Sequence, residues 1–242
     1  MKAPDFAYVK ATSVEHAIGE LVRHGDAAHL LAGGQSLTAM LNMRLAAPAC
    51  IVDIGGLPGL DAIRRDGDTV HVGALVTHAQ LQASAEIAAS VPLLAQAVPH
   101  VAHLAIRNAG TVGGSLALAD PAAEYPAVAL ALGATLVLQG PGGVRRVPAE
   151  DFFRGLYVTA RRPDEVLVSV ELPVRRPSAR ACFDELARRR GDYAMVGLAA
   201  TLEIEAGTVR RPRLAFLSMG DRPMLARGAM AALADRPADA AA

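Results

Sequence analysis

Two short loops contain the residue types that can bind a phosphate group. They are Ala32-Gly33-Gly34-Gln35-Ser36 and Thr111-Val112-Gly113-Gly114-Ser115. Because glycine has no Cβ, paired glycines can adopt positive φ and turn successive backbone N–H groups toward one anion. A helix beginning after each loop would add a favourable dipole, and Ser36 and Ser115 could donate hydroxyl hydrogen bonds. Two such loops together suit a pyrophosphate, which carries charge on two neighbouring groups.

Other kinds of site have less support in the sequence. Either glycine loop alone could be an ordinary tight turn. The chain contains neither G-x-G-x-x-G in a β-α-β setting nor GxxxxGK[ST], which disfavours a Rossmann dinucleotide site and a P-loop. His100 and His103 lack a carboxylate or cysteine at a spacing that would complete a zinc site. The sequence contains no Ser-His-Asp arrangement of the kind that would indicate a hydrolase.

The bulk composition excludes several classes of function. Lys and Arg total 24 and Asp and Glu total 24, so no net charge would attract nucleic acid or an anionic membrane. The richest apolar stretch, 126–138, is shorter than the ~20 residues that span a bilayer. The first residues contain no signal-peptide core, which predicts a cytoplasmic protein. The two cysteines, Cys50 and Cys182, cannot supply the four thiolates of a [2Fe–2S] cluster.

The first glycine loop is expected to lie inside a small β-α-β unit. Thr12 and Glu15 form a capping box for a helix that Gly25 ends. A short apolar strand precedes the loop, and a helix and a second strand follow it. These three elements are predicted at 28–31, from the loop to about residue 45, and at 50–53, before the Gly55-Gly56 turn.

The second glycine loop lies in a longer region of mixed helices and strands. Helices are predicted at 77–84, at 86–104 with breaks at two prolines, and at 122–132. Strands are predicted at 69–72, 134–138 and 165–172, with a hairpin turn at 140–143. After a linker at 175–177, three antiparallel strands are expected at 181–187, 198–205 and 209–218, followed by a tail from 221 that is helical at first. The pattern indicates the α+β class and three domains, at 1–56, 57–173 and 177–242.

Five motifs occur in an order and at separations that match one family. Besides the two glycine loops, the second of which lies in the run 106–115, they are Asp120-Pro121-Ala122-Ala123-Glu124, the segment 164–173, and Arg188-Arg189-Arg190-Gly191-Asp192-Tyr193-Ala194. On these residues the chain resembles the FAD-binding medium subunit of the xanthine dehydrogenase and aerobic carbon monoxide dehydrogenase family. The resemblance extends from Phe6 to about Met230.

The resemblance implies a PCMH or vanillyl-alcohol-oxidase type of fold. Two lobes would hold FAD non-covalently between them, and a small C-terminal domain of antiparallel sheet and helix would reach the flavin ring. The backbone at Leu167 would lie close to the flavin, and Tyr193 would pack near its face. The residues implied to bind FAD are Ala32, Gly33, Gly34, Gln35, Ser36, Thr111, Val112, Gly113, Gly114, Ser115, Glu124, Leu167 and Tyr193.

Some of these residues also have simpler interpretations. Tyr193 could be a core tyrosine at a helix start, and an acid at Glu124 is favoured there by the helix dipole alone. Arg107 and Asn108 are expected to brace the second loop rather than to bind the cofactor. The arginines at 188–190 could be a solvated face or a subunit contact.

The resemblance also implies an electron relay within a larger enzyme. A large subunit with a molybdenum-pterin cofactor would oxidise the substrate. A small subunit with [2Fe–2S] clusters would pass electrons to FAD on this chain, in a dimer of heterotrimers, and an external acceptor would receive them. No side chain of this chain would be catalytic. The alternatives are a stand-alone flavin oxidoreductase such as a MurB-like reductase, and a non-redox module that binds a nucleotide or assembles a complex.

Two features depart from the family pattern. A lysine is common in the family near Phe183, whereas this sequence continues with Asp184 and Glu185. This puts any lysine contact to the flavin or the acceptor in doubt. The sequence ends at Ala242, where similar subunits continue for further helices, so the C-terminal domain is expected to be shortened.

Overall fold

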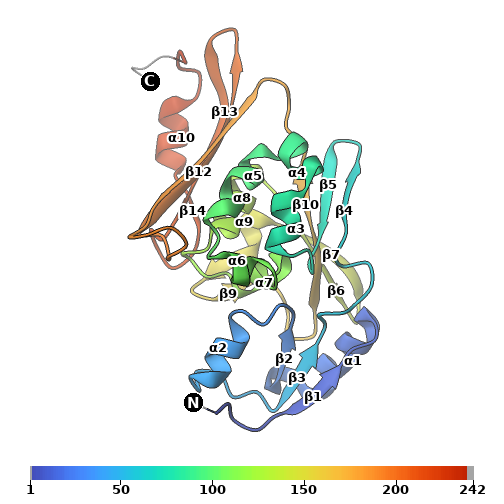
Figure 1. Cartoon of the computed structure of the whole chain (residues 1–242). Coiled ribbons are helices and arrows are strands. Elements are labelled where there is room, and N and C mark those ends of the chain that lie inside the picture. The colour runs from blue at the N-terminus through green and yellow to red at the C-terminus, as the bar shows by residue number, and fades with distance from the viewer. Residues whose placement is uncertain (1, 239–242) are drawn as a thin grey trace.

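The computed structural model describes residues 2–238. It contains three larger sheets, and a layer of helices lies between the second and the third (Figure 1). This is the mixed α+β organisation that the sequence predicts. Within the described residues, no helix combines the length and the apolar character needed to cross a bilayer.

The N-terminal lobe is a three-stranded parallel sheet that holds the first glycine loop. Its strand order is β1-β3-β2, and helix α1 packs on β2 and β3. Strands β2 and β3 are confirmed where the sequence predicts them, whereas β1 is not predicted. The elements are β1 Ala7–Lys10, α1 Val14–His24, the 3-10 turn η1 Gly25–Ala27, β2 Ala28–Leu31, α2 Leu37–Asn42 and β3 Cys50–Asp53.

Two details of the predicted helices in this lobe are wrong. The N-cap of α1 is Ser13 rather than Thr12, because the Ser13 hydroxyl accepts the hydrogen bond from the His16 N–H at 3.1 Å. Helix α2 ends at Asn42, three residues before the predicted end. The predicted stop at Gly25 is confirmed, since Gly25 has φ of 55° and caps the helix.

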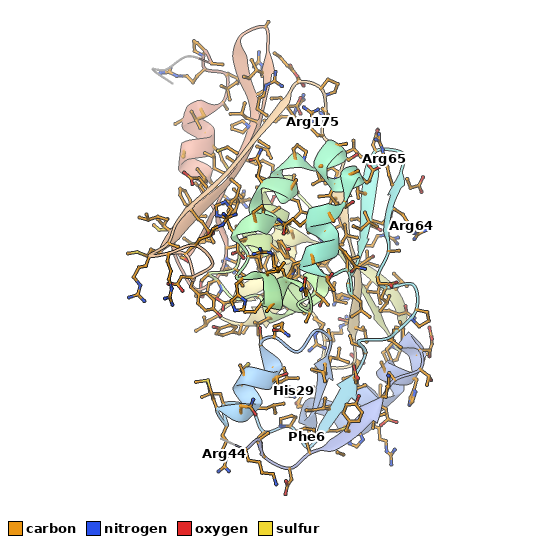
Figure 2. The ribbon with its side chains drawn as sticks, viewed as in Figure 1. Phe6, His29, Arg44, Arg64, Arg65 and Arg175 are labelled. Atoms are coloured by element: carbon orange, nitrogen blue, oxygen red, sulfur yellow. The ribbon has the colours of Figure 1, made fainter. Side chains whose placement is uncertain are left out.

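The central lobe is a five-stranded antiparallel sheet in the order β4-β5-β10-β6-β7. The predicted hairpin is confirmed, with Gly140 paired to Gly143 across a two-residue turn. Edge strand β4 is not predicted, and Figure 2 shows Arg64 and Arg65 along it. The strands are β4 Ile63–Asp66, β5 Thr69–Gly73, β6 Thr135–Gly140, β7 Gly143–Pro148 and β10 Val166–Pro173.

Short helices and a small hairpin complete the central lobe. The expected interruptions at Pro92 and Pro99 are seen, because each proline lies in the first turn of a new helical segment. The helices are α3 His78–Ala83, α4 Ala85–Ser90, α5 Pro92–Ala97, η2 Val98–His100, α6 Leu104–Arg107, α7 Val112–Leu118, α8 Glu124–Leu132 and α9 Ala149–Phe152, and the hairpin is β8 Phe153–Gly155 with β9 Val158–Thr159.

The C-terminal part is an antiparallel sheet that leans on helices α5 and α8. The three predicted strands are present, and a two-residue strand, β14, adds to β13. The expected helical start at Asp221 is wrong, because β14 comes first and α10 begins only at Arg227. The elements are β11 Ala179–Leu186, β12 Val196–Glu205, β13 Thr208–Leu217, β14 Met224–Leu225 and α10 Arg227–Leu233.

Two hydrophobic cores hold the three sheets together. The smaller core joins α1 and the N-terminal sheet to Leu60, Leu75 and Val166 of the central lobe. The larger core continues from the central sheet and helices into the C-terminal sheet, where Phe183 and Leu217 are buried. The C-terminal sheet is therefore fixed to the helical layer by shared apolar burial.

Candidate functional site

A cleft of about 640 Å³ lies where the N-terminal lobe meets the helical layer, and the 191–193 segment closes one side. Figure 2 shows His29 of β2, one of its lining residues, in the N-terminal lobe. The structure brings the predicted cofactor residues together here, with one exception. Val112 is buried beneath the wall. The predicted residues that line the cleft are Ala32, Gly33, Gly34, Gln35, Ser36, Thr111, Gly113, Gly114, Ser115, Glu124, Leu167 and Tyr193.

The first glycine loop has free backbone donors. It connects β2 to α2, and Gly34 has φ of 71°, a conformation that favours glycine. Within residues 2–238, no protein acceptor bonds the N–H groups of residues 33–36. The Gln35 side chain donates to the Gly33 carbonyl at 2.9 Å and stabilises the turn. This loop therefore has the donors that an anion requires.

Gly33 packs the first glycine loop against Ala109 and Gly110, the two residues that lead into the second loop. A Cβ at this position would lie 2.0 Å from the Ala109 carbonyl oxygen and 2.9 Å from the Gly110 Cα. No larger residue fits without moving backbone. Gly33 does not have a positive φ, so it is required by this close approach rather than by its dihedral angle.

The second glycine loop differs from its predicted form. Its N–H groups at 112–115 are all used within the protein, by acceptors on Val76, Ala74 and Thr111. Neither Gly113 nor Gly114 has a positive φ, because both lie in the first turn of α7. The expected nest of free donors is therefore wrong for this loop. A Cβ on Gly113 would lie 2.5 Å from the Ala74 Cβ, so glycine here permits close packing.

A buried pair lies behind the second loop and is missed by the sequence reasoning. The His78 Nδ1 and the Tyr125 hydroxyl are 3.1 Å apart. Burial, with a smaller contribution from the Arg107 charge, lowers the pKa of His78 to about 4, so the imidazole is neutral near pH 7. His78 lines the cleft and lies against Gly110, where a Cβ would be 2.7 Å from the His78 Nε2. The Thr77 cap places His78 at the start of α3, but nothing in the sequence indicates its tertiary partner.

Glu124 and Tyr193 lie in the outer part of the cleft wall. Burial raises the pKa of Glu124 to about 7, and the Glu185 and Asp120 carboxylates act in the same direction. Tyr193 is 75% exposed, which disagrees with the alternative that it is a core tyrosine. Leu167 is buried and lies at an irregularity in the β10–β6 pairing.

Two arginines support the cleft in different ways. Arg107 donates from Nη1 to the carbonyls of Val101 and Ala102, both at 2.9 Å, which agrees with the bracing role expected from the sequence. Gly191 packs on that same turn, since its Cβ would lie 2.7 Å from the Ala102 oxygen. Arg161 lines the cleft and was not predicted. Its Nη1 donates to the Arg162 and Glu165 carbonyls, and burial lowers its pKa.

The histidines at 100 and 103 have different surroundings from those of a ligand cluster. His100 pairs with Glu185 at 3.3 Å. Among residues 2–238, no group of three His, Cys, Asp or Glu side chains is arranged to hold a metal ion. The cleft instead fits an anionic cofactor, because it combines free N–H donors, an arginine and a wall shaped by closely packed glycines.

Comparisons with known proteins agree with that fit. A family model for the FAD binding domain in molybdopterin dehydrogenase matches residues 4–175, and one for the CO dehydrogenase flavoprotein C-terminal domain matches residues 181–242. The subunit alpha of the 6-hydroxypseudooxynicotine dehydrogenase complex of Paenarthrobacter nicotinovorans is 44% identical over 91% of this chain and 75% of its own length. The carbon monoxide dehydrogenase medium chain of Hydrogenophaga pseudoflava is 36% identical over 94% of this chain and 79% of its own length.

Solved structures give the same result. A carbon monoxide dehydrogenase of Hydrogenophaga pseudoflava, which lacks the Mo-pyranopterin moiety of the molybdenum cofactor, contains a chain that matches with a TM-score of 0.97 at 37% identity. That match covers 100% of this chain and 84% of the other. Quinoline 2-oxidoreductase of Pseudomonas putida 86 matches with a TM-score of 0.93 at 40% identity, over 99% of this chain and 83% of the other.

Proposed function

The chain belongs to the family of FAD-binding subunits of molybdenum hydroxylases, and from that premise we propose that it relays electrons from a partner iron–sulfur subunit through FAD to an external acceptor. The observation that carries the proposal is the first glycine loop, with unbonded N–H groups at 33–36 in a cleft that the second loop completes. When bound, FAD supplies the ability to accept electrons singly and release them in pairs.

The side chains of this subunit bind and orient rather than react. The N–H groups of the first loop would hold the pyrophosphate, with Arg161 as a neighbouring cation. Thr111 and Ser115 would add hydroxyl contacts from the second loop, and Tyr193 would pack near the ring. The full set proposed to bind FAD is the predicted one: Ala32, Gly33, Gly34, Gln35, Ser36, Thr111, Val112, Gly113, Gly114, Ser115, Glu124, Leu167 and Tyr193. Val112 would act only through packing, because its side chain is buried.

The partners would be a small subunit with [2Fe–2S] clusters and a large subunit with the molybdenum-pterin cofactor. These are the partners expected from the family, and a dimer of heterotrimers is the proposed assembly. We propose the domain boundaries 1–56, 57–173 and 177–242 for this subunit. The three sheets and the two family models, which meet between 175 and 181, support the last boundary.

The mouth of the cleft is the proposed docking surface for the iron–sulfur subunit. Electrons must cross a short distance, so the partner should contact the side where Tyr193 is exposed. The Tyr157 hydroxyl donates to the Asp120 carboxylate of the cleft wall at 3.4 Å, so Tyr157 also lies at the edge of the cleft. Arginines 188–190, close to Tyr193 in the chain, are also exposed. The exposed apolar side chains close to Tyr157 or Tyr193 in the chain are Leu156, Val158, Leu186 and Met195.

FAD content and the way FAD is attached can be measured directly. The complex purified with its two partner subunits should be yellow and should contain equimolar FAD, which acid precipitation should release intact. Iron and molybdenum should remain with the other subunits after separation. Flavin that stays with the precipitated protein would contradict non-covalent binding. A complex that forms fully but contains no flavin would favour the non-redox assembly module.

The alternatives have less support. A stand-alone flavin oxidoreductase of the MurB type would be active without partners, whereas the two relatives compared by sequence above are named as a subunit and a medium chain of dehydrogenases. The cytoplasmic location expected from the sequence stays a prediction, and fractionation of the native host tests it directly.

A further inference from the structure

The buried pair of His78 and Tyr125 has no role in the proposed function. His78 lines the cleft and is 5% exposed, whereas Tyr125 is 2% exposed. The His78 Nδ1 lies 3.1 Å from the Tyr125 hydroxyl, and the two rings meet edge to face with their centroids 5.2 Å apart. One hydrogen bond thus joins two buried polar side chains from different helices, α3 and α8.

This hydrogen bond determines which nitrogen of His78 carries the proton. Burial lowers the pKa of His78 to about 4, so near pH 7 the ring is neutral, with one donor nitrogen and one acceptor nitrogen. Within residues 2–238, the Tyr125 hydroxyl has no other partner, and a buried hydroxyl requires an acceptor for its proton. The hydroxyl therefore donates to Nδ1, and Nε2 carries the proton of the imidazole.

The Nε2 edge of the His78 ring is open toward the cleft. Nε2 has no hydrogen-bond partner in the described part of the chain, yet it is not one of the polar atoms that are completely buried without a partner there. Gly110 also lines the cleft and leaves this edge uncovered, because a Cβ at 110 would lie 2.7 Å from Nε2 and 2.9 Å from Cδ2. Gly110 does not have a positive φ, so the close approach of His78 is what requires glycine there.

The second glycine loop lacks free donors of its own beside this edge. Its N–H groups at 112–115 are all used within the protein. A ligand oxygen on this side of the cleft therefore needs side-chain donors, since an oxygen that loses water without a new hydrogen bond is destabilised.

We propose that the Nε2–H of His78 donates a hydrogen bond to an oxygen of bound FAD beside the second loop, and that Tyr125 is a positioning residue that holds the imidazole in this orientation. The inference rests on the proposed function. A neutral N–H donor suits a phosphate oxygen and a hydroxyl oxygen equally, because it repels neither.

Two replacements of His78 separate a donor from a packing residue. The side-chain amide of His78→Gln reaches about as far as Nε2, whereas that of His78→Asn reaches only about as far as Nδ1. Each variant is purified in the complex with its partner subunits, freed of flavin, and titrated with FAD while the flavin fluorescence is followed. His78→Gln should bind FAD nearly as well as the unchanged complex, and His78→Asn should bind about tenfold more weakly, which is the effect of one lost hydrogen bond.

Tyr125→Phe tests the positioning role without removing the donor. Only the hydroxyl is lost, so the ring of His78 is no longer held in one orientation, and FAD should bind about twofold to tenfold more weakly. The amide of His78→Gln has no ring tautomer to fix, so adding Tyr125→Phe to that variant should change the affinity much less. Such non-additivity is expected of two residues that act as one unit.

His71→Gln is the matched control, because it makes the same substitution away from the cleft. His71 on β5 lies 3.8 Å from Glu171 and is not part of the cleft wall. This variant should bind FAD like the unchanged complex. The melting temperature of each flavin-free complex measures separately whether a substitution destabilises the fold.

Two results would overturn the inference. Unchanged affinity in His78→Asn and Tyr125→Phe would make the pair packing residues, and equal weakening in His78→Gln and His78→Asn would show that the Nε2 donor is not what matters. If a His78 variant fails to assemble, Tyr125→Phe decides alone, since unchanged affinity contradicts the positioning role. The proposed function stays intact in these cases because the unchanged complex binds FAD, whereas an unchanged complex that binds no FAD would overturn both proposals.

Discussion

At the scale of single residues, the glycines of the site have different physical tasks. Gly34 adopts positive φ in the turn, whereas Gly33 and Gly113 permit backbone or side chains to approach closely. The sequence motif alone cannot distinguish these two requirements, because either one is met by the same Gly-Gly dipeptide. The distinction determines how a substitution should act.

Gly33→Val should weaken FAD binding to the complex by pushing the first glycine loop away from Ala109 and Gly110, which lead into the second loop. The new side chain must displace the Ala109 carbonyl, since even its Cβ would be 2.0 Å away. Overpacking of this kind costs about 1–3 kcal/mol, and where the cost falls on the FAD-bound form it corresponds to roughly fivefold to 150-fold weaker binding. The FAD content of the purified complex measures the effect.

The matched control for that variant is Gly19→Ala. Gly19 lies in helix α1, and a Cβ there meets nothing within 4 Å. It should keep full FAD content and stabilise the helix slightly. Equal and complete FAD content in both variants would show that the loop contact is not needed for binding.

At the scale of elements, the apolar pattern predicts the buried strands well and the edge strands poorly. Strands β2 and β3 are found at their predicted positions because they are short apolar runs between turns. Strand β4 reads Ile63-Arg64-Arg65-Asp66 and β1 is largely exposed, so neither has the pattern of a buried strand. Their pairing with neighbours decides their structure, and pairing is not visible in a local window.

The candidate site shows the same limit. Its two loops are found by motif, but the motif does not show which donors are free. The donors of Val112 and Gly113 are occupied by the carbonyls of Val76 and Ala74, which lie far earlier in the chain. His78 and Arg161 lie in the cleft for the same reason. Their positions follow from packing between elements, which residue spacing does not reveal.

The C-terminal sheet should lose stability in acid through Glu203. This buried carboxylate on β12 accepts hydrogen bonds from Arg211 Nε at 2.8 Å and from the Ser178 hydroxyl at 3.1 Å, and these bonds lower the pKa of Glu203 to about 2. A lowered pKa stabilises the fold above the unfolded value of 4.5, and this contribution is lost as pH falls from there toward 2.

Glu203→Gln should therefore lower stability at pH 7 by roughly 1 kcal/mol, because its arginine partners are exposed. It should also flatten the decline of the melting temperature between pH 5 and pH 3, measured by circular dichroism. Glu205→Gln is the control, since Glu205 contacts the same Arg211 from an exposed position. An acid profile for Glu203→Gln like that of the unchanged protein would contradict this role.

At the scale of the whole molecule, the three sheets are not independent. The larger hydrophobic core runs from the central sheet through α5 and α8 into the C-terminal sheet. Gly191 and the Arg107-braced turn join the same two parts at the cleft. The segment that carries Tyr193 is therefore held against the cleft by both apolar packing and backbone contact.

The division of labour between subunits gives the last prediction. This chain alone should show at most slow electron transfer to artificial acceptors and no hydroxylation of the substrates that the full complex oxidises. Its two cysteines, one buried on β3 and one exposed on β11, cannot ligate an iron–sulfur cluster.

Stepwise reconstitution measures this division. The iron–sulfur subunit alone, reduced chemically, should transfer electrons to the flavin of this chain, whereas substrate should reduce the flavin only after the molybdenum subunit is added. Stopped-flow absorbance of the flavin follows both steps. Hydroxylation by this chain without molybdenum would refute the relay and favour the stand-alone oxidoreductase, because only a substrate pocket on this polypeptide could then explain turnover.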